Sequence, residues 1–472
     1  MTRDAVSARD AATPDRATAR GHAGPPNADR LLSVEEARSA VLGAISGPTD
    51  AEVVYLSVAR GRILAEDVMS LTALPPWDNS AMDGYAIRAA DVSGASDAGP
   101  VLLAVIGEVR AGSAPDVAVE RGTAVRIATG APIPPRADAV VQVELTTPAD
   151  VTGAALGARG RDATGPLPAA VLVHQAIGVG AAIRRAGDDL AEATLVLSVG
   201  TRLGAAAITL AAGSGNETLR VHRQPRIGIL ATGDEVRAAG RALGPAGIPD
   251  ANGPGLAALA EEAGASAQTL GIAADRIEDV RARLKVALYG DLEAVVVSGG
   301  VSVGPYDVVR AAFAEIGRME LWRVAVQPGK PFAFGVVDRP DGGRCLLFGL
   351  PGNPVSSFVT FELFVRPAIR RLAGIPENRL LRSTDRATLL DGASKAPGRR
   401  AYLRVVAERD ADGAPRRDAA GRVGVRLAGG GRGQGSHVLS ALALADGLAI
   451  VPESVDAVAP GGPVDLWWLD RD

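Results

Sequence analysis

The sequence contains one cysteine, Cys345, and four histidines among its 472 residues. A single thiol cannot form a disulfide within the chain, and it cannot supply a cluster of thiolate ligands for zinc. So little cysteine is compatible with a reducing compartment, and we predict a cytoplasmic location. Any bound metal is expected to be an ion that prefers oxygen ligands, such as Mg²⁺.

Aromatic residues are also scarce, at 3%, and the formal net charge is −4 at pH 7. Nucleic-acid surfaces are built from clustered basic residues and stacking rings, so we expect no nucleic-acid partner. No stretch reaches the ~18 consecutive uncharged apolar residues that a membrane helix needs, so we expect no membrane partner either. Residues 1–30 mix acids and bases without an apolar centre, which is typical of a disordered tail and not of a secretory signal.

The chain is too long for one small core, so three or four folding units are expected. Helical spacing at 31–46 predicts a first helix, with Ser33 as its N-cap and Glu36 as the partner in a capping box. Short apolar runs then predict a mostly β unit, with a solvent loop at 146–170. Later strand-like runs alternate with helical ones, which predicts a doubly wound parallel sheet with helices on both faces.

We therefore predict a multidomain α/β plus β protein. Its expected parts are a disordered tail (1–30), a helical and extended linking domain (31–52 and 171–205), a mostly β domain (53–170), a central α/β domain (206–376) and a small C-terminal β domain (377–472).

The stretch SGGVSVGPYD, residues 298–307, follows the apolar run Ala-Val-Val-Val and opens a predicted helix. A turn rich in free amides at such a place can hold an oxyanion. The stretch lacks the Gly-Lys-Ser/Thr ending of a nucleoside-triphosphate loop, so no triphosphate site is indicated. Ser298, Gly299 and Gly300 are candidate phosphate-binding residues.

Acidic residues follow other strands of the same predicted sheet. Asp234 and Glu235 come after the strand RIGIL, and Asp250 stands just before a helix. Ligands of open parallel sheets bind outside the carboxyl ends of the strands, so these loops are expected to converge there. Each acid alone is as easily explained as a helix cap or a turn residue. Acids beside a phosphate would repel it unless a divalent cation lay between them, which favours Mg²⁺ at this edge.

A cation for a second anion site is offered by Lys330, which stands in a Pro-Gly-Lys-Pro turn. A lysine in a turn is usually a solvated surface residue, but a proline on each side restricts where it points. DNSAMDGYAIR, residues 78–88, and IATGAP, residues 127–132, are denser in polar residues than a plain hairpin or turn requires, although both could be turns.

Together these strings resemble the molybdopterin molybdenumtransferase family, the bacterial relatives of the gephyrin E domain. The matching strings occur in the family's order from about residue 31 to the end of the chain: GRILAEDV, DNSAMDGYAIR, RIATGAPIP, IRRAGDDL, ILATGDEV, SGGVSVGPYD, QPGKPFAFG, LPGNPVSS and GQGSH. The resemblance implies an elongated four-part subunit that forms a homodimer. It also implies an active site at the carboxyl edge of the α/β domain, completed by the partner subunit.

The reaction implied by the resemblance depends on Mg²⁺. Adenylylated molybdopterin is cleaved to release AMP while molybdate is inserted at the dithiolene, which gives molybdenum cofactor. Because the pterin supplies the sulfur ligands, a chain with one cysteine can perform this chemistry. Molybdate and adenylylated molybdopterin are the implied substrates, and molybdopterin adenylyltransferase is the implied upstream partner.

The resemblance carries the family's site residues over by position. Those at the Mg²⁺ and adenylate end are Asp234, Asp250 and Asp307, with Asp234 and Asp250 as metal ligands and Ser298, Gly299 and Gly300 around the phosphate. The implied catalytic positions are Asp83, Thr129, Asp189, Asp234 and Asp250. The implied molybdate pocket comprises Lys330, Ser356, Arg404 and Ser436, with Pro351 and Pro354 in its wall.

Two positions depart from the family's pattern. Gln327 stands where lysine is usual before Pro-Gly-Lys, and Gly253 stands where arginine is usual after Asp-x-Asn. Each lost charge-assisted contact is expected to weaken anion binding by ~1 to 3 kcal/mol, for which Arg323 is a candidate compensation. Two alternatives to the transferase remain: a non-catalytic scaffold or carrier with a degenerate molybdate pocket, and the preceding adenylyl transfer, which would require an ATP site.

Overall fold

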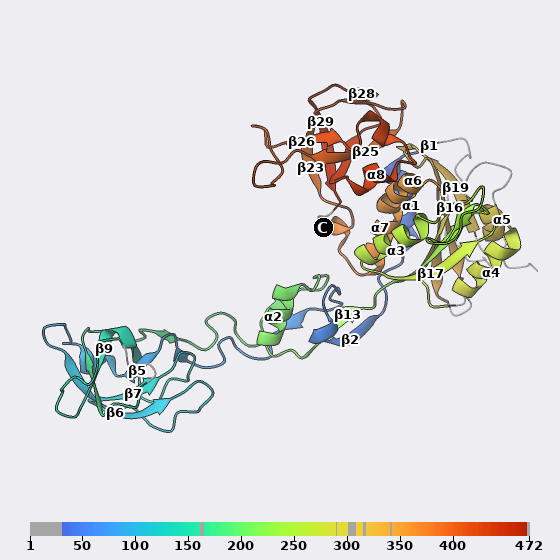
Figure 1. The fold of residues 1–472 in the computed structure, drawn as a ribbon. Helices are drawn as coiled ribbons and strands as arrows, with labels where there is room; N and C mark the ends of the chain where they lie inside the picture. Colours follow the sequence, from blue (N-terminus) through green and yellow to red (C-terminus); the bar gives the residue numbers. More distant parts are fainter. Residues whose placement is uncertain are drawn as a thin grey trace, which may run out of the picture. The chain divides into compact units, whose positions relative to one another are not determined.

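The computed structural model describes residues 31–160, 165–288, 290–300, 308–314, 318–339 and 342–469. The predicted tail, residues 1–30, and Asp307 lie outside the described residues. The chain divides into two compact units, one of Met1–Ser46, Pro225–Ile369 and Asn378–Asp472, the other of Gly47–Gln224 and Arg370–Glu377. Figure 1 labels the elements of both units. No helix of the described part is long and apolar enough to cross a membrane.

The first unit is built on a seven-stranded sheet with the order β1-β19-β21-β22-β18-β14-β17. Strands β17, β14, β18 and β22 are parallel, β21 and β19 are antiparallel to their neighbours, and β1 is parallel to β19. The strands are β1 (Leu31–Leu32), β14 (Arg226–Thr232), β17 (Ser266–Ala273), β18 (Ala294–Ser298), β19 (Arg318–Val324), β21 (Pro331–Asp338) and β22 (Arg344–Leu350). The predicted parallel sheet is thus confirmed for the part that follows Pro225, and the sheet as a whole is mixed.

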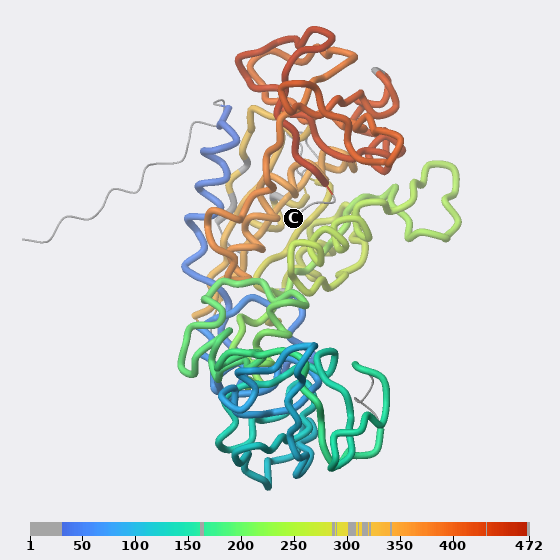
Figure 2. Tube along the Cα trace, turned by 90° about the vertical axis from the view of Figure 1, so that its left-hand side faces the viewer, coloured from blue at the N-terminus to red at the C-terminus, as the bar shows by residue number. Residues whose placement is uncertain are grey.

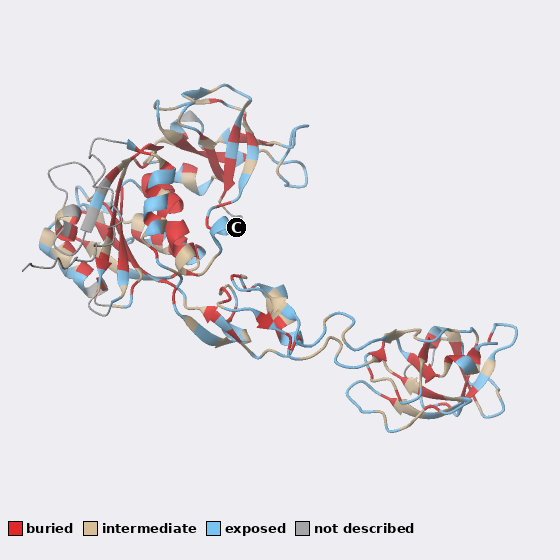
Figure 3. Cartoon of the chain, turned by 180° about the vertical axis from the view of Figure 1, so that it is seen from behind, coloured by how far each residue is buried: buried red, intermediate tan, exposed pale blue. Residues whose placement is uncertain are grey.

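Helices cover both faces of this sheet, as a doubly wound fold requires. Val295 and Val297 of β18 share a buried cluster with Leu284 of α4 and Phe313 of α5, while Val296 between them is directed to the opposite face, on which α3 and α6 pack. The central strands are accordingly buried along their length, as the red strands in Figure 3 show. The helices are α1 (Val34–Gly43), α3 (Asn252–Glu262), α4 (Ile277–Leu288), α5 (Val308–Ala314), α6 (Pro354–Thr360), the π-helix η4 (Phe361–Val365) and α7 (Arg366–Leu372).

The C-terminal part of the first unit is a small closed β structure. Its strand β25 pairs with both β26 and β27, so the sheet β20-β25-β26-β23-β29-β27 closes on itself. The strands are β20 (Val326–Gln327), β23 (Thr384–Leu389), β25 (Arg400–Ala407), β26 (Val423–Leu427), β27 (Gly447–Val451) and β29 (Gly462–Trp468), with the short pair β24 (Ala393–Ser394) and β28 (Ala457–Val458) and the helices η6 (Gly431–Gln434) and α8 (Leu439–Ala443). The prediction of a closing β domain is confirmed.

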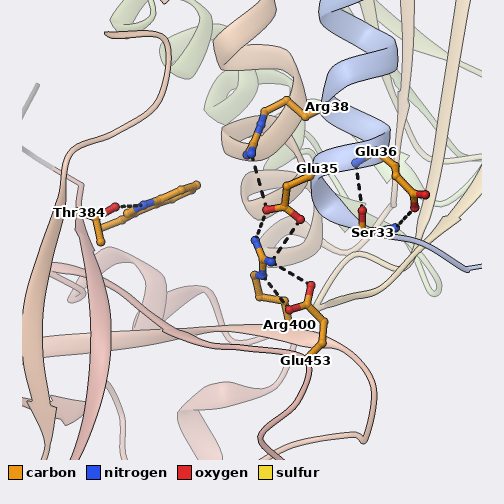
Figure 4. A network of polar contacts seen from close by, with 8 residues as sticks. Ser33, Glu35, Glu36, Arg38, Thr384, Arg400 and Glu453 are labelled. Carbon is orange, nitrogen blue, oxygen red and sulfur yellow. Dashed lines mark hydrogen bonds and ion pairs between the residues drawn. The ribbon is translucent and has the colours of Figure 1, made fainter. Parts of the chain in front are cut away.

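Charged contacts join α1 to this β structure (Figure 4). Arg400 lies between Glu35 of α1, at 2.5 Å, and Glu453, at 3.1 Å. The predicted capping box of α1 is confirmed, because Ser33 Oγ accepts from the amide of Glu36 at 3.1 Å and Glu36 accepts from the amide of Ser33 at 2.8 Å. The first residues of α1 are therefore both capped and held to β25.

The second unit contains a six-stranded sheet with the order β8-β5-β7-β6-β10-β9. These strands are β5 (Gly84–Ile87), β6 (Val101–Val109), β7 (Thr123–Ile127), β8 (Ala139–Gln142), β9 (Thr146–Ala149) and β10 (Ala170–Val173). The predicted solvent loop at 146–170 is wrong at its start, because 146–149 form β9, which is buried and pairs with β10. Alanine, threonine and proline in that stretch concealed the strand, whose burial depends on its distant partner.

A smaller linking part completes the second unit. It contains β2 (Ala51–Tyr55), β3 (Val68–Met69), β4 (Asn79–Ser80), β11 (Ile183–Arg184), β12 (Leu195–Leu197), α2 (Ala205–Gly213) and β13 (Thr218–His222). Residues 206–224, which we placed in the α/β domain, belong here, because β13 pairs antiparallel with β2 and Ala211 of α2 packs on Leu219 and Val221.

Candidate functional site

A cavity of about 780 Å³ lies at the carboxyl ends of the parallel strands. Its wall includes Thr232 at the end of β14, Ser298 at the end of β18 and Pro351 after β22, together with Asp275 from the loop after β17. His437 reaches it from the C-terminal β structure. The loops that follow four parallel strands thus converge, which is the usual position of a ligand site in an open α/β sheet.

The turn after β18 requires glycine at two consecutive positions. Gly299 and Gly300 have φ values of +100° and +62°. A Cβ atom would lie 2.6 Å from Thr232 Oγ1 if added at 299, and 2.4 Å from a methyl group of Val309 if added at 300. The backbone can therefore approach β14 closely and line the cavity without side chains, which is how glycine turns admit phosphate groups.

Asn252 connects the loops around this turn. Its Nδ2 donates to Ser298 Oγ at 2.6 Å and to the carbonyl of Gly352 at 2.7 Å. Ser298 is only 2% exposed, and the bond from the side-chain amide of Asn252 fixes the position of its hydroxyl. In the sequence, Asn252 stands with Asp250 just before a predicted helix at this sheet edge, but the family's site positions do not include it.

Asp250 also lines the cavity and accepts a hydrogen bond from the first turn of α3. Its Oδ1 accepts from the amide of Gly253 at 2.8 Å, while its Oδ2 lies 2.4 Å from the place that a Cβ atom at 253 would occupy. Gly253 therefore leaves room for the carboxylate. The larger residue usual at this position in the resembling family would require a different placement of Asp250.

A second group of carboxylates lies beside the cavity. The amide of Asp275 donates to Asp234 Oδ1 at 3.1 Å, and the amide of Asp234 donates to Asp275 Oδ2 at 3.4 Å. Asp275 and Glu235 line the cavity, whereas Asp234 lines a neighbouring hollow of about 600 Å³. That hollow is bounded by the loop between β15 (Val236–Arg237) and β16 (Ile248–Pro249), the projecting yellow-green loop of Figure 2.

Burial raises the pKa of Asp275, and the negative charges of Glu235 and Asp234 raise it further. For Asp275, burial and these like charges outweigh the hydrogen bond that its carboxylate accepts from the amide of Asp234. Among the residues that the structure describes, no three acidic, histidine or cysteine side chains are grouped as a ready metal site. Sequence analysis missed Asp275, although it follows its strand in the same way as Asp234.

Three cations, Lys330, Arg323 and Arg399, lie near one another at the Pro-Gly-Lys-Pro turn. The amide of Val324 donates to the carbonyl of Lys330 at 2.9 Å, and Arg323 lies opposite Pro331 in the strand register. Partial burial lowers the pKa of Lys330, and the charges of Arg323 and Arg399 lower it further. A Cβ atom added at Gly329 would lie 3.4 Å from the carbonyl oxygen of Ser356, so this turn lies close to the first turn of α6.

Arg404 is fully buried, with 0% exposure. Its Nη2 donates to the carbonyls of Gly433 and Gly435, but within the described part of the chain its Nε and Nη1 have no hydrogen-bond partner. Burial lowers the pKa of Arg404 to about 10. Buried donors of a guanidinium are rarely left unpaired, so a bound anion or water is expected to satisfy them.

A second cavity, of about 670 Å³, lies in the C-terminal β structure, where Gln327 of β20 and Tyr402 of β25 line it. Ser436 lines this cavity, whereas its neighbour His437 lines the cavity at the sheet edge. Of the residues implied for the molybdate pocket, Pro351 and Pro354 lie at the sheet edge, and Ser436 lies in the second cavity. Lys330, Ser356 and Arg404 line neither of these two cavities, so the structure does not bring the whole implied set to one cavity wall. The amide of Val355 donates to the carbonyl of Ser436 at 3.3 Å, so both cavities border the start of α6.

The chain matches family models along most of its length. They are described as the MoeA N-terminal region (domain I and II) for residues 32–215, a probable molybdopterin binding domain for 228–371 and the MoeA C-terminal region (domain IV) for 386–469. It is 34% identical to molybdopterin molybdenumtransferase 1 of Mycobacterium tuberculosis over 93% of this chain and 99% of that protein. The chain belongs to the molybdopterin molybdenumtransferase family.

Other relatives agree. The molybdopterin molybdenumtransferase of Nostoc sp. is 38% identical over 69% of this chain and 70% of that protein. Two crystal structures of the molybdopterin biosynthesis MoeA protein of Pyrococcus horikoshii superpose with TM-scores of 0.72 and 0.71, at 29% and 25% identity, over 93% of this chain and 99% or more of theirs. The family consists of enzymes of molybdenum cofactor biosynthesis, as the resemblance implied.

Three of the family's site positions lie in the second compact unit. Asp83 Oδ1 accepts from both the amide and the hydroxyl of Thr129, at 2.7 and 2.9 Å, so the structure brings this pair together. Asp189 is held through its backbone, which donates to the carbonyl of Leu74 at 2.9 Å. Among the described residues, no hydrogen bond joins Asp189 to the pair.

The second departure from the family pattern, Gln327, has a defined contact. Its Oε1 accepts from the amide of Ala396 at 3.0 Å, and its side chain lines the second cavity. Glutamine thus fastens the start of β25 to β20 at a position where a lysine could not accept that bond.

Proposed function

We propose that this chain inserts molybdate into adenylylated molybdopterin and releases AMP in a Mg²⁺-dependent reaction, giving molybdenum cofactor. The observation that carries the proposal is the presence, in one unit, of an acidic cavity with a glycine turn and of a cation-rich region that comprises Lys330, Arg323 and Arg399. Arg404, with its unpaired donors, bonds to Gly435, which lines the second cavity together with Arg399. Cleavage of an adenylate needs carboxylates that hold a metal ion, whereas binding of a metal oxyanion needs positively charged donors.

The acidic cavity suits the adenylate end of the substrate. Ser298 and the backbone of Gly299 and Gly300 would receive the phosphate groups, with Asn252 holding the Ser298 hydroxyl in position. Mg²⁺ usually takes one or two carboxylates and completes its shell with phosphate oxygens and water, so the absence of a ready three-ligand group in the described part is compatible with it. Asp250, with Glu235 or Asp275, would hold the ion, and the bound ion would neutralise the phosphate charge.

The cation-rich region suits molybdate, a tetrahedral dianion. Nε and Nη1 of Arg404, the ammonium of Lys330 and the hydroxyl of Ser436 are donors for its oxygens. A cysteine thiolate is not available to the metal, because Cys345, the one cysteine of the sequence, is buried and burial raises its pKa to about 12. The dithiolene of the pterin would therefore be the sulfur source.

We also propose that the chain acts in the cytoplasm as a homodimer, downstream of a molybdopterin adenylyltransferase. Large apolar side chains are exposed on the linking part of the second unit, which favours a subunit contact there. The most exposed are Val53, Tyr55, Val58 and Leu71, at 61–65%. The adenylylated substrate must come from an enzyme that transfers an adenylyl group to molybdopterin.

The test of the proposal is AMP release by the purified protein from adenylylated molybdopterin. We expect release to require both Mg²⁺ and molybdate, and release that needs neither would refute the proposal. The alternative, a scaffold that binds molybdopterin without turnover, is favoured only by Gln327 and Gly253. Calorimetric titration with molybdate separates the two, because a degenerate pocket would give no saturable heat.

A further inference from the structure

The segment before β25 is fastened to the strand before the Lys330 turn. The amide of Arg400 donates to the carbonyl of Ala325 at 2.8 Å, and the amide of Ala396 donates to Gln327 Oε1 at 3.0 Å. In the parallel pairing of β20 with β25, Gln327 lies opposite Ala401. Bonds on both sides of Arg399 therefore fix its backbone close to the Pro-Gly-Lys turn.

Arg399 and Arg400 are neighbours with different surroundings. Arg400 forms ion pairs with Glu35 and Glu453 (Figure 4), so its positive charge is balanced by carboxylates of the protein. Arg399 is half-buried in the wall of the second cavity and, among the residues that the structure describes, has no ion pair or hydrogen bond. An arginine at such a position is usually solvated. Here its positive charge lowers the pKa of Lys330, as a nearby cation does.

The remaining wall of the second cavity offers hydrogen-bond groups and no opposing charge. Gln327, Tyr402, Gln434 and Ser436 line it, and no aspartate or glutamate is found among its lining residues. Burial raises the pKa of Tyr402 to about 12, so its phenol stays a donor at neutral pH. Cations that repel one another, with no carboxylate among the residues lining the cavity, create a local positive potential, which an anion would relieve.

We propose that Arg399 is an anion-binding residue of the oxyanion pocket and shares with Lys330 the recognition of a tetrahedral dianion. The inference rests on the proposed function and adds a residue that the family's site positions do not include. It also accounts for Gln327: the positive charge that a lysine at 327 would bring is supplied by Arg399, which directly precedes β25, the partner strand of β20. Gln327 is then free to hold Ala396 and, with it, the segment that carries Arg399.

The test is calorimetric titration of the full chain with molybdate in the absence of Mg²⁺ and nucleotide. Arg399→Gln is expected to weaken molybdate binding by about 10-fold or more, as loss of one charge-assisted contact does, whereas Arg399→Lys retains most of the affinity. Arg386→Gln, which removes an exposed arginine of the same β structure outside both cavities, is the matched control and leaves binding unchanged. Thermal unfolding of each variant checks the fold, and Arg399 holds no contact whose loss would unfold it.

Equal dissociation constants for the wild-type protein and Arg399→Gln would overturn the inference and leave the proposed function intact. Absence of saturable molybdate binding in the wild-type protein would overturn both. Parallel titrations with phosphate identify the anion: tighter binding of phosphate than of molybdate, lost in Arg399→Gln, would assign Arg399 to a phosphate group of the substrate and also overturn the inference.

Discussion

Gly253 and Asp250 are packed so closely that a Cβ atom at 253 would lie 2.4 Å from Asp250 Oδ2. The carboxylate occupies the space that a side chain at 253 would need. The same carboxylate accepts from the amide of Gly253 and lines the acidic cavity. Asp250 can therefore hold this position only because residue 253 is glycine and not the arginine usual in the family.

Gly253→Ala should displace the Asp250 carboxylate. We expect the Mg²⁺ concentration for half-maximal AMP release to rise by about 10-fold, because a ligand moved from its position loses a charge-assisted contact. The measurement is a Mg²⁺ titration of the release rate. Gly255→Ala is the matched control, since a Cβ atom there meets nothing within 4 Å; it should leave the titration unchanged and stabilise α3 by about 0.5–1 kcal/mol.

Asp275→Asn tests the unbalanced acidic group. The pKa of Asp275 is raised above its ordinary value of 3.8, so its ionised form costs stability at neutral pH, and this cost is lost as the pH falls through the raised pKa. The variant should therefore unfold at a higher temperature than the wild type at about pH 7 without Mg²⁺, and the difference should narrow on acidification. Thermal unfolding across this pH range is the measurement.

Added Mg²⁺ should stabilise the wild-type protein more than Asp275→Asn, because the ion offsets the repulsion that the variant already lacks. Asp412→Asn, in an exposed turn, serves as the control and should show neither effect. A variant less stable than the wild type at every pH would show that Asp275 is a structural residue and not part of an unbalanced charge cluster.

Arg404→Met tests the buried guanidinium. Molybdate should raise the unfolding temperature of the wild-type protein, because it would pair with the free Nε and Nη1, and this increase should vanish in the variant. The variant should also lose about 1–3 kcal/mol without ligand, since the carbonyls of Gly433 and Gly435 lose their donor. Arg386→Met should keep the full molybdate effect, and an undiminished effect in Arg404→Met would remove Arg404 from the pocket.

Thr129→Ala tests the pair in the second unit. Both bonds from Thr129 end on Asp83 Oδ1, and the variant removes the one from the hydroxyl. We expect AMP release to fall by about 10-fold, as when a positioned carboxylate loses its orientation, with the molybdate dissociation constant unchanged. Thr129→Ser keeps the hydroxyl and should keep the rate. Equal loss in both variants would point to packing of the threonine methyl group and not to the hydrogen bond.

Local patterns predicted much of the fold. The capping box of Ser33 and Glu36 is a short-range signal, and the alternation of strands and helices after Pro225 is confirmed by the sheet that contains β14, β18 and β22. The strand at 146–149 was missed because its burial comes from pairing with β10, more than 20 residues further along the chain. The placement of α2 and β13 was missed for the same reason, since β2, their partner, lies about 160 residues earlier.

In the site, too, local patterns predicted some residues, and residues placed by long-range pairing were not predicted. The position of Ser298, Gly299 and Gly300 at a sheet edge could be inferred from the strand that precedes them, and Asp275 could have been found by the same argument. Arg399 could not, because its place beside the Lys330 turn depends on the pairing of Gln327 with Ala401. Neither of the two local sequences predicts that these segments pair.

The most direct measurement is AMP release from adenylylated molybdopterin by the wild-type protein, with Mg²⁺ and molybdate each present or omitted. The account predicts rapid release only when both are present, because the phosphate end needs the ion and the oxyanion pocket needs its substrate. Release at the same rate without molybdate, or no release under any of the four conditions, would contradict it.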